Sequence, residues 1–216
     1  MGKDQIKITS SCVIDDNKVF KDDQLVFEGK AVRAADFLVE LYNYIAPDYP
    51  KFYKMDNLSK LGWLAAEILL KNSFDRAACK AEETGVVLSN SNSSLDTDRR
   101  YFQTISEYPS PSLFVYTLPN IVIGEICIRN QFQGENAFFV FDGFQPDFLE
   151  QYVTGLIKNG TVRTCICGWV DILADNYKAA LYLVREDQKG IVFTSDNISR
   201  LFKRATNYNT DNPDKQ

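Results

Sequence analysis

Five cysteines and a complete lack of histidine define the chemistry open to this chain. Without an imidazole, the 216 residues have no histidine to act as general base, proton shuttle or metal ligand. A Ser-His-Asp triad, a Cys-His dyad and any zinc site that needs histidine are therefore excluded within the chain. The cysteines lie in apolar or helical contexts without Cys-x-x-Cys spacing, at Cys12, Cys79, Cys127, Cys165 and Cys167. We expect reduced, mostly buried thiols and no cofactor or metal.

Two of these thiols form a Cys-x-Cys pair, Cys165 and Cys167, inside an apolar run that predicts a strand. Residues two apart in a strand share a face with their Cα atoms roughly 6.5–7 Å apart, at the outer limit of disulfide geometry. No companion ligands stand nearby to complete a tetrahedral metal site. The pair is therefore expected to be part of the core.

Glu125 is the only charged residue between Leu113 and Ile128, on a stretch that predicts an apolar, buried helix starting at Asn120. A carboxylate there must find a partner or face a cleft. Two interpretations follow: a buried ion pair or exposed helix edge, or an acid that serves an interface or pocket.

An aromatic cluster follows in the next predicted strand and turn, with Phe138, Phe139, Phe141, Phe144 and Phe148. Alternation along a strand would place these rings on both faces of a sheet, as core residues. The alternative is an acyl-binding pocket or a subunit contact filled with rings.

The composition, 45% hydrophobic and 25% charged, is that of a folded globular protein. A net charge of −5 disfavours nucleic-acid binding, which depends on a basic face. The sequence shows neither a signal-peptide pattern nor an apolar run long enough to cross a membrane, so a cytoplasmic location is expected.

Hydrophobic periodicity predicts strands that alternate with helices. The expected strands are 6–14, 18–27, 84–88, 137–141, 162–170, 178–184 and 190–193, and the expected helices are 31–44, 59–70, 95–105, 120–131, 148–158 and 197–203. Asp56 or Asn57 is placed to cap the second helix. This order predicts an α/β layered fold with a mostly parallel mixed central sheet flanked by helices, and one antiparallel addition from the last two strands. Residues 1–204 are expected to form a single domain and residues 205–216 a flexible tail.

Five segments, in this order, resemble the β-ketoacyl synthases. They are Lys54–Leu69 with its Lys-Met-Asp start, Thr84–Asp98, Tyr116–Gly124 with its Pro-Asn-x-x-x-Gly pattern, Gln133–Asn136 and Leu156–Asp171. The resemblance covers roughly residues 50–185 and implies the N-terminal half of a thiolase-like fold.

The resemblance also implies that the catalytic residues are missing. The family's nucleophilic cysteine would fall at or beside Asp142-Gly143, and the family's two catalytic histidines come from a second half that has no counterpart here. Decarboxylative condensation needs a thiolate to hold the acyl chain and donors that stabilise an enolate. Asp142 is a poor substitute, because its carboxylate is a weak nucleophile toward thioesters.

The resemblance therefore implies a non-catalytic, chain-length-factor-like partner subunit in fatty-acid or polyketide-type biosynthesis. We expect a homodimer, or a heterodimer with a full-length β-ketoacyl synthase, with acyl-carrier protein as a further partner. The family dimerises through the strand before the nucleophile, here 137–141, and the helix 118–128 would need a cover. The candidate interface or pocket residues are Asn120, Gly124, Glu125, Phe138, Phe139, Phe141 and Phe144. Two alternatives remain: a 3-oxoacyl-acyl-carrier-protein synthase or acyltransferase whose site a partner chain completes, and a stand-alone protein that binds acyl chains or acyl-carrier protein.

Overall fold

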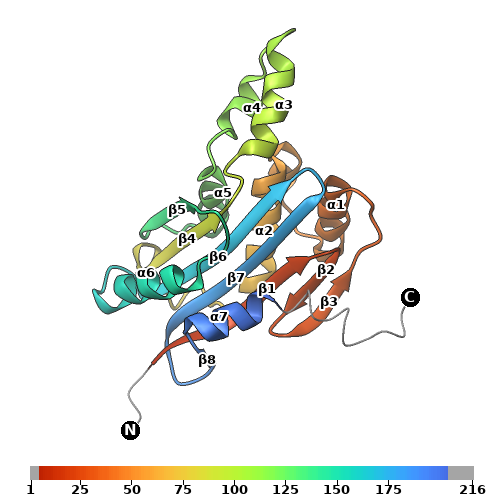
Figure 1. The fold of residues 1–216 in the computed structure, drawn as a ribbon. Helices are drawn as coiled ribbons and strands as arrows, with labels where there is room; N and C mark the ends of the chain where they lie inside the picture. Colours follow the sequence, from red (N-terminus) through yellow and green to blue (C-terminus); the bar gives the residue numbers. More distant parts are fainter. Residues whose placement is uncertain (1–4, 204–216) are drawn as a thin grey trace.

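The computed structural model describes residues 5–203, so the tail predicted for residues 205–216 lies outside the described residues. One mixed sheet runs through the molecule in the order β3-β2-β1-β7-β6-β4-β5, with β8 beside β1 (Figure 1). The strands are β1 (Gln5–Asp15), β2 (Lys18–Lys21), β3 (Gln24–Glu28), β4 (Thr84–Asn90), β5 (Asn136–Val140), β6 (Thr164–Leu173), β7 (Asn176–Asp187) and β8 (Ile191–Val192).

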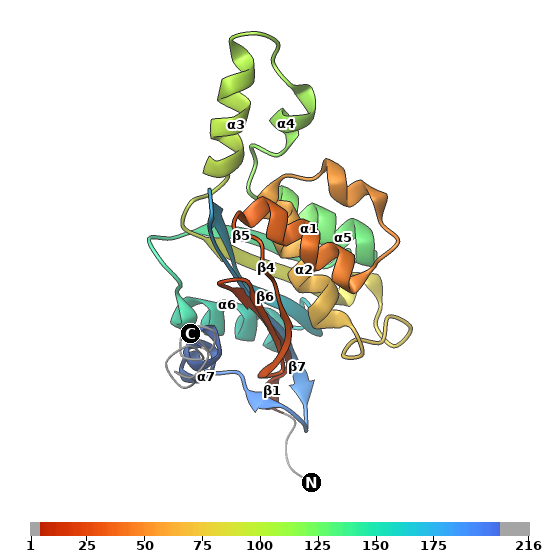
Figure 2. The same cartoon turned by 90° about the vertical axis from the view of Figure 1, so that its right-hand side faces the viewer.

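The helices pack on both faces of this sheet (Figure 2). The α-helices are α1 (Ala34–Ile45), α2 (Asn57–Leu70), α3 (Leu95–Ile105), α4 (Pro111–Val115), α5 (Ile121–Asn130), α6 (Pro146–Lys158) and α7 (Ser195–Phe202), and the 3-10 helices are η1 (Pro50–Lys54) and η2 (Ala81–Glu83). One core lies under α1, α2 and α5, and a second lies under α6 and α7. The expected layered α/β fold with a mixed central sheet is confirmed.

Strand alternation assigns residues to these two cores. In β4, which is buried along its whole length, Val86 and Leu88 belong to the first core and Val87 to the second. Cys165 and Cys167 point into the second core as buried free thiols, which confirms their prediction as core residues. A strand covered on both faces carries apolar side chains on both of them, as Val86, Val87 and Leu88 do here.

The parallel part of the sheet is smaller than expected. Within the described chain, β4 pairs in parallel with β5 and β6, and the other five pairings are antiparallel. The expected pairing of the last two strands is wrong: β8 pairs with β1, through Lys7 and Ile8. Both edges of β7 are already occupied by β1 and β6, so β8 has no free edge on β7.

The start of α2 confirms the predicted cap. The Asp56 carboxylate accepts a hydrogen bond of 2.9 Å from the backbone N–H of Ser59, which is the standard way to satisfy the first turn of a helix. Gly62 then lets α5 approach closely, since a Cβ at Gly62 would lie 2.3 Å from Cγ2 of Val122. The contact brings α5 onto α2 and fixes the helical layer on this face.

Helices α3 and α4 stand off the body of the molecule beyond the end of β4 (Figures 1 and 2). We call residues 95–118 the arm. The helix predicted for residues 95–105 is present as α3, but only Thr97 of its eleven residues is buried.

Candidate interaction surface

The turn between β5 and α6 is where the resemblance places a nucleophile. The turn holds Asp142 and Gly143, of which Asp142 is exposed, and a Cβ at Gly143 would meet nothing within 4 Å. The thiols of the chain lie elsewhere, and burial makes three of them poor nucleophiles. Burial raises the pKa of Cys12 and of Cys167 far above the ordinary thiol value, and raises that of Cys127 to about 11.

The predicted aromatic cluster is divided by the sheet. Phe138 packs against the first core, whereas Phe139 and Phe144 pack against the second. Phe139 and Phe141 join two rings of α6, with the Phe139 centroid 4.7 Å from Phe148. Phe144 instead stacks on Phe202 of α7 at 4.1 Å. The structure therefore does not bring the predicted rings into one pocket.

Strand β5 carries one of these ring groups at an edge of the sheet. Among residues 5–203, β5 pairs with β4 alone, from Asn136 to Val140. The side chain of Val140, at the end of the strand, leaves the residue 50% exposed. An edge strand with a free row of N–H and C=O groups is a template for pairing with another chain.

Glu125 lies in a buried ion pair, which is the first of the two predicted interpretations. Its Oε2 is 2.6 Å from Nζ of Lys51 in η1, and its Oε1 accepts a hydrogen bond of 3.0 Å from the hydroxyl of Tyr116. Burial, with the neighbouring Glu125 charge, raises the pKa of the Tyr116 phenol far above its ordinary value. Because Tyr116 follows α4, this pair attaches the base of the arm to η1 and α5.

Asn120 and Gly124, the other predicted residues of this region, take no part in this ion pair. Asn120 is exposed and makes no side-chain cap for α5, and a Cβ at Gly124 would meet nothing within 4 Å. Ile128 is 63% exposed. The expectation that this helix would be buried all round is therefore wrong, because α5 packs on α2 with one face and leaves the other uncovered within the described chain.

The arm concentrates the exposed apolar side chains of the molecule, and its exposure was missed at the sequence level. Half of the large exposed apolar residues among residues 5–203 belong to it: Leu95, Phe102, Ile105, Tyr108, Phe114, Val115 and Leu118. Phe102 is 73% exposed and Tyr108 is 84% exposed. The two prolines at 109 and 111 were the one available signal, because they separate α3 from α4 and turn the chain back.

The base of the arm is held by a polar network. Thr97 donates a hydrogen bond of 2.6 Å to the buried Asp56 carboxylate, and Ser94 donates one of 2.7 Å to the carbonyl of Thr117. Asp96 accepts one of 3.0 Å from the backbone N–H of Ala174 in the β6–β7 turn. The arm is therefore an exposed apolar element on a fixed base, which is a form suited to docking.

Comparisons with known proteins give the fold and nothing finer. No family model matches the chain, and no curated protein matches it. Among solved structures, the chain resembles "The ishigamide ketosynthase/chain length factor" at a TM-score of 0.62 and 16% identity, over 86% of this chain and 63% of that one. A β-ketoacyl synthase from Burkholderia phymatum STM815 gives 0.59 and 11%, over 86% and 60%.

A third structure differs in the share of its length that is matched. It is the complex of the ketosynthase ApeO with its chain length factor ApeC from Xenorhabdus doucetiae, where the TM-score is 0.58 and the identity 11%, over 92% of this chain and 90% of the matched one. The chain thus spans less than two thirds of the two preceding neighbours and nearly all of this one. At these identities the likeness establishes a thiolase-like fold.

Within residues 5–203, no cluster of three or more histidine, cysteine, aspartate or glutamate residues could hold a metal ion. No helix in that range combines the length and the apolar character needed to span a membrane.

Proposed function

We propose that this chain is a non-catalytic, chain-length-factor-like subunit that pairs with a full-length β-ketoacyl synthase. The observation that carries the proposal is a thiolase-like fold whose β5–α6 turn has Asp142 and Gly143 in place of a thiol, next to an open edge strand and an exposed apolar arm. Neighbours with the same fold include ketosynthases in complex with a chain length factor.

The partner is expected to pair with β5 and to cover the arm. Phe102, Tyr108 and Phe114 are between 59% and 84% exposed. Rings of this kind bury ~150–250 Å² each, so these three can contribute on the order of 400 Å². A standard interface buries about 800 Å² on each partner, and the β5 edge with its neighbouring side chains would supply the remainder.

Co-expression with a β-ketoacyl synthase of the source organism tests the pairing. Light scattering after size-exclusion chromatography should give a complex of one copy of each chain. Val140→Lys places a charge on the β5 edge and Phe102→Ser removes an arm ring, and each should weaken the complex about tenfold or more. Val192→Lys, on the exposed β8 at the other end of the molecule, is the matched control and should leave the complex unchanged (Figure 1).

Two results would contradict this function. One is a chain that remains monomeric at micromolar concentration both alone and with the synthase. The other is covalent acylation of any residue after incubation with an acyl thioester, detected by mass spectrometry, which would favour the alternative of an acyltransferase completed by a partner. We expect no mass increase, because the turn after β5 offers no thiol.

A further inference from the structure

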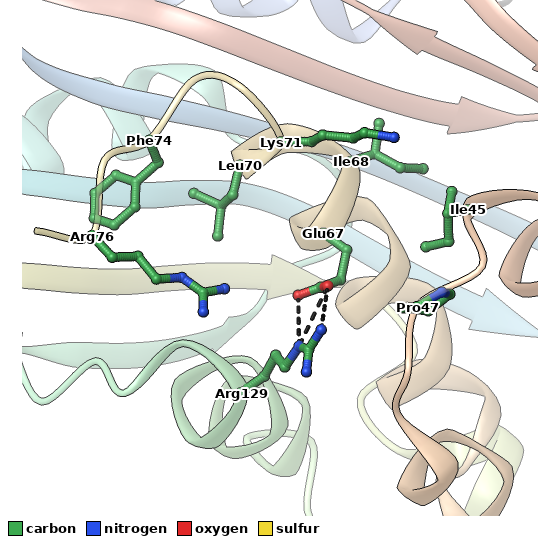
Figure 3. Close-up of a pocket in the computed structure, with 9 residues that line it drawn as sticks. All are labelled: Ile45, Pro47, Glu67, Ile68, Leu70, Lys71, Phe74, Arg76 and Arg129. Carbon is green, nitrogen blue, oxygen red and sulfur yellow. Dashed lines mark hydrogen bonds and ion pairs between the residues drawn. The ribbon is translucent and has the colours of Figure 1, made fainter.

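A cavity of about 300 Å³ opens where α1, α2 and α5 end (Figure 3). Its lining combines apolar side chains, among them Ile45, Ile68 and Phe74, with four charged ones, Glu67, Lys71, Arg76 and Arg129. The volume is at the lower limit of small-molecule sites, which are mostly apolar with a few polar groups that orient the ligand. The residues proposed above for partner binding lie elsewhere.

Three cations and one acid make this cavity positive in a chain that is acidic overall, with a net charge of −5. Arg129 is bound to Glu67, with Nη2 at 3.3 Å from Oε2 and Nε at 3.3 Å from Oε1 (Figure 3). The Arg129 guanidinium also lies 4.9 Å from the centre of the Tyr49 ring. Glu67 is thus neutralised, and the charge left to meet a ligand is that of Lys71 and Arg76.

Arg76 is held at the cavity by a buried amide. Its Nη2 donates a hydrogen bond of 2.6 Å to Oδ1 of Asn130, whose Nδ2 donates one of 2.9 Å to the carbonyl of Ile126. Asn130 is only 4% exposed, so a buried side chain fixes the position of the Arg76 guanidinium. No carboxylate among residues 5–203 lies within ion-pair distance of Arg76. Its remaining N–H donors have the planar fork that matches an oxyanion.

Helix ends carry partial negative charge, which would oppose an anion here. Two carbonyls at the end of α2, however, already accept hydrogen bonds. The carbonyl of Leu70 accepts from the backbone N–H groups of Ser73 and Phe74, and that of Lys71 accepts from Nζ of Lys21. Lys21 also adds a positive charge beside Lys71. The side-chain cations therefore set the sign of the potential in the cavity.

We propose that this cavity binds a phosphate monoester carried on a small apolar group. Arg76 has no carboxylate partner among residues 5–203, and its N–H fork matches the phosphate oxygens. Lys71 extends away from Arg76 (Figure 3) and adds positive charge to the cavity, and the apolar side chains of the lining receive the organic part. The site is independent of the partner function proposed above.

Isothermal titration calorimetry with phenyl phosphate tests the site. We expect saturable binding in the micromolar to low millimolar range, with inorganic phosphate and phenol each at least about tenfold weaker, because each offers half of the required contacts. Arg76→Gln should weaken phenyl phosphate about tenfold or more, the loss expected for a charged hydrogen bond. Arg200→Gln, an exposed arginine of α7 on the opposite face of the sheet, is the matched control and should change nothing (Figure 2).

The proposal is overturned by the absence of saturable binding up to about 5 mM phenyl phosphate. Equal affinities of the Arg76→Gln and Arg200→Gln variants would overturn it too. Benzoate tests whether the cavity prefers a phosphate to a carboxylate. If benzoate binds as tightly as phenyl phosphate, the phosphate assignment is refuted. Arg76 is exposed, so its variant is expected to fold, and a circular dichroism melt recorded beside the titration verifies this.

Discussion

The pair of Lys51 and Glu125 anchors the arm, and its removal should be measurable in stability. Lys51→Met leaves the Glu125 carboxylate buried with the Tyr116 hydroxyl at 3.0 Å as its remaining donor. Breaking a fully buried pair in this way costs about 3–5 kcal/mol. The Lys51 side chain is 41% exposed, so water already compensates part of the charge, and we expect a loss of about 2 kcal/mol.

Glu125→Gln tests the asymmetry of the pair. The amide still accepts from Tyr116, and the freed Lys51 ammonium can turn toward water, so the expected loss is only about 1 kcal/mol. The double variant should then be more stable than the sum of the two losses predicts, by a coupling of about 1 kcal/mol. Urea unfolding of all four proteins at pH 7 measures these quantities. A Lys51→Met variant that is as stable as Glu125→Gln, or additive losses, would refute the assignment of a buried, coupled pair.

Three further predictions concern packing, pH and thiol reactivity. Gly62→Ala should lower the free energy of unfolding by about 1–3 kcal/mol, because the new methyl group overlaps Val122. Gly124→Ala, on the open face of α5, should raise it by about 0.5–1 kcal/mol through helix propensity. Denaturant titration measures both changes, and changes of the same sign would contradict the packing. Burial raises the pKa of the Asp56 carboxyl group, so the native state binds this proton more tightly than the unfolded state does. The contribution of Asp56 to stability therefore falls as the pH rises from the ordinary aspartate pKa of about 4 through the raised pKa of the native state. Asp56→Asn should therefore gain stability relative to the natural chain as pH rises from about 4 to 7, and a difference that stays constant over this range would count against the buried carboxylate. Iodoacetamide should label Cys79 first in the native protein, since the other thiols are buried or have a raised pKa, and peptide mapping would reveal any other order.

The sequence predicts those parts of the fold that depend on neighbours along the chain. Helix α2 and its cap at Asp56 follow from periodicity and one side-chain hydrogen bond. The burial of β4 on both faces follows from the apolar residues 85–88 within it. The β6–β7 hairpin gives a weaker signal, because its turn places Ala174, at φ 54°, where glycine or asparagine is usual. The expectation of a mostly parallel sheet came from missing this long antiparallel pairing.

The candidate site was harder to predict from the sequence, because its contacts join segments that are distant along the chain. Glu125 could be recognised as a charge that needs a partner, but nothing local identifies Lys51 as that partner. The amphipathic pattern of α3 is the same whether its apolar stripe faces a core or solvent, so its exposure depends on tertiary structure. The alternation of rings along β5 correctly predicted that they lie on both faces of the sheet. That β5, with Phe138 and Phe139 on its opposite sides, is an edge strand follows only from the order of strands in the sheet.

The arm and the proposed anion cavity lie at opposite ends of one helix, which makes their independence testable. Asp56, at the start of α2, accepts a hydrogen bond from Thr97 at the base of the arm. Glu67 and Lys71 line the cavity at the other end of α2. Fourteen residues of α-helix span about 21 Å, beyond the screening length of roughly 8 Å at physiological salt. A partner seated on the arm should therefore change the affinity for phenyl phosphate less than twofold in calorimetry. A larger change would mean that a movement of α2 couples the two sites. The arm would then be a regulatory element as well as a docking surface.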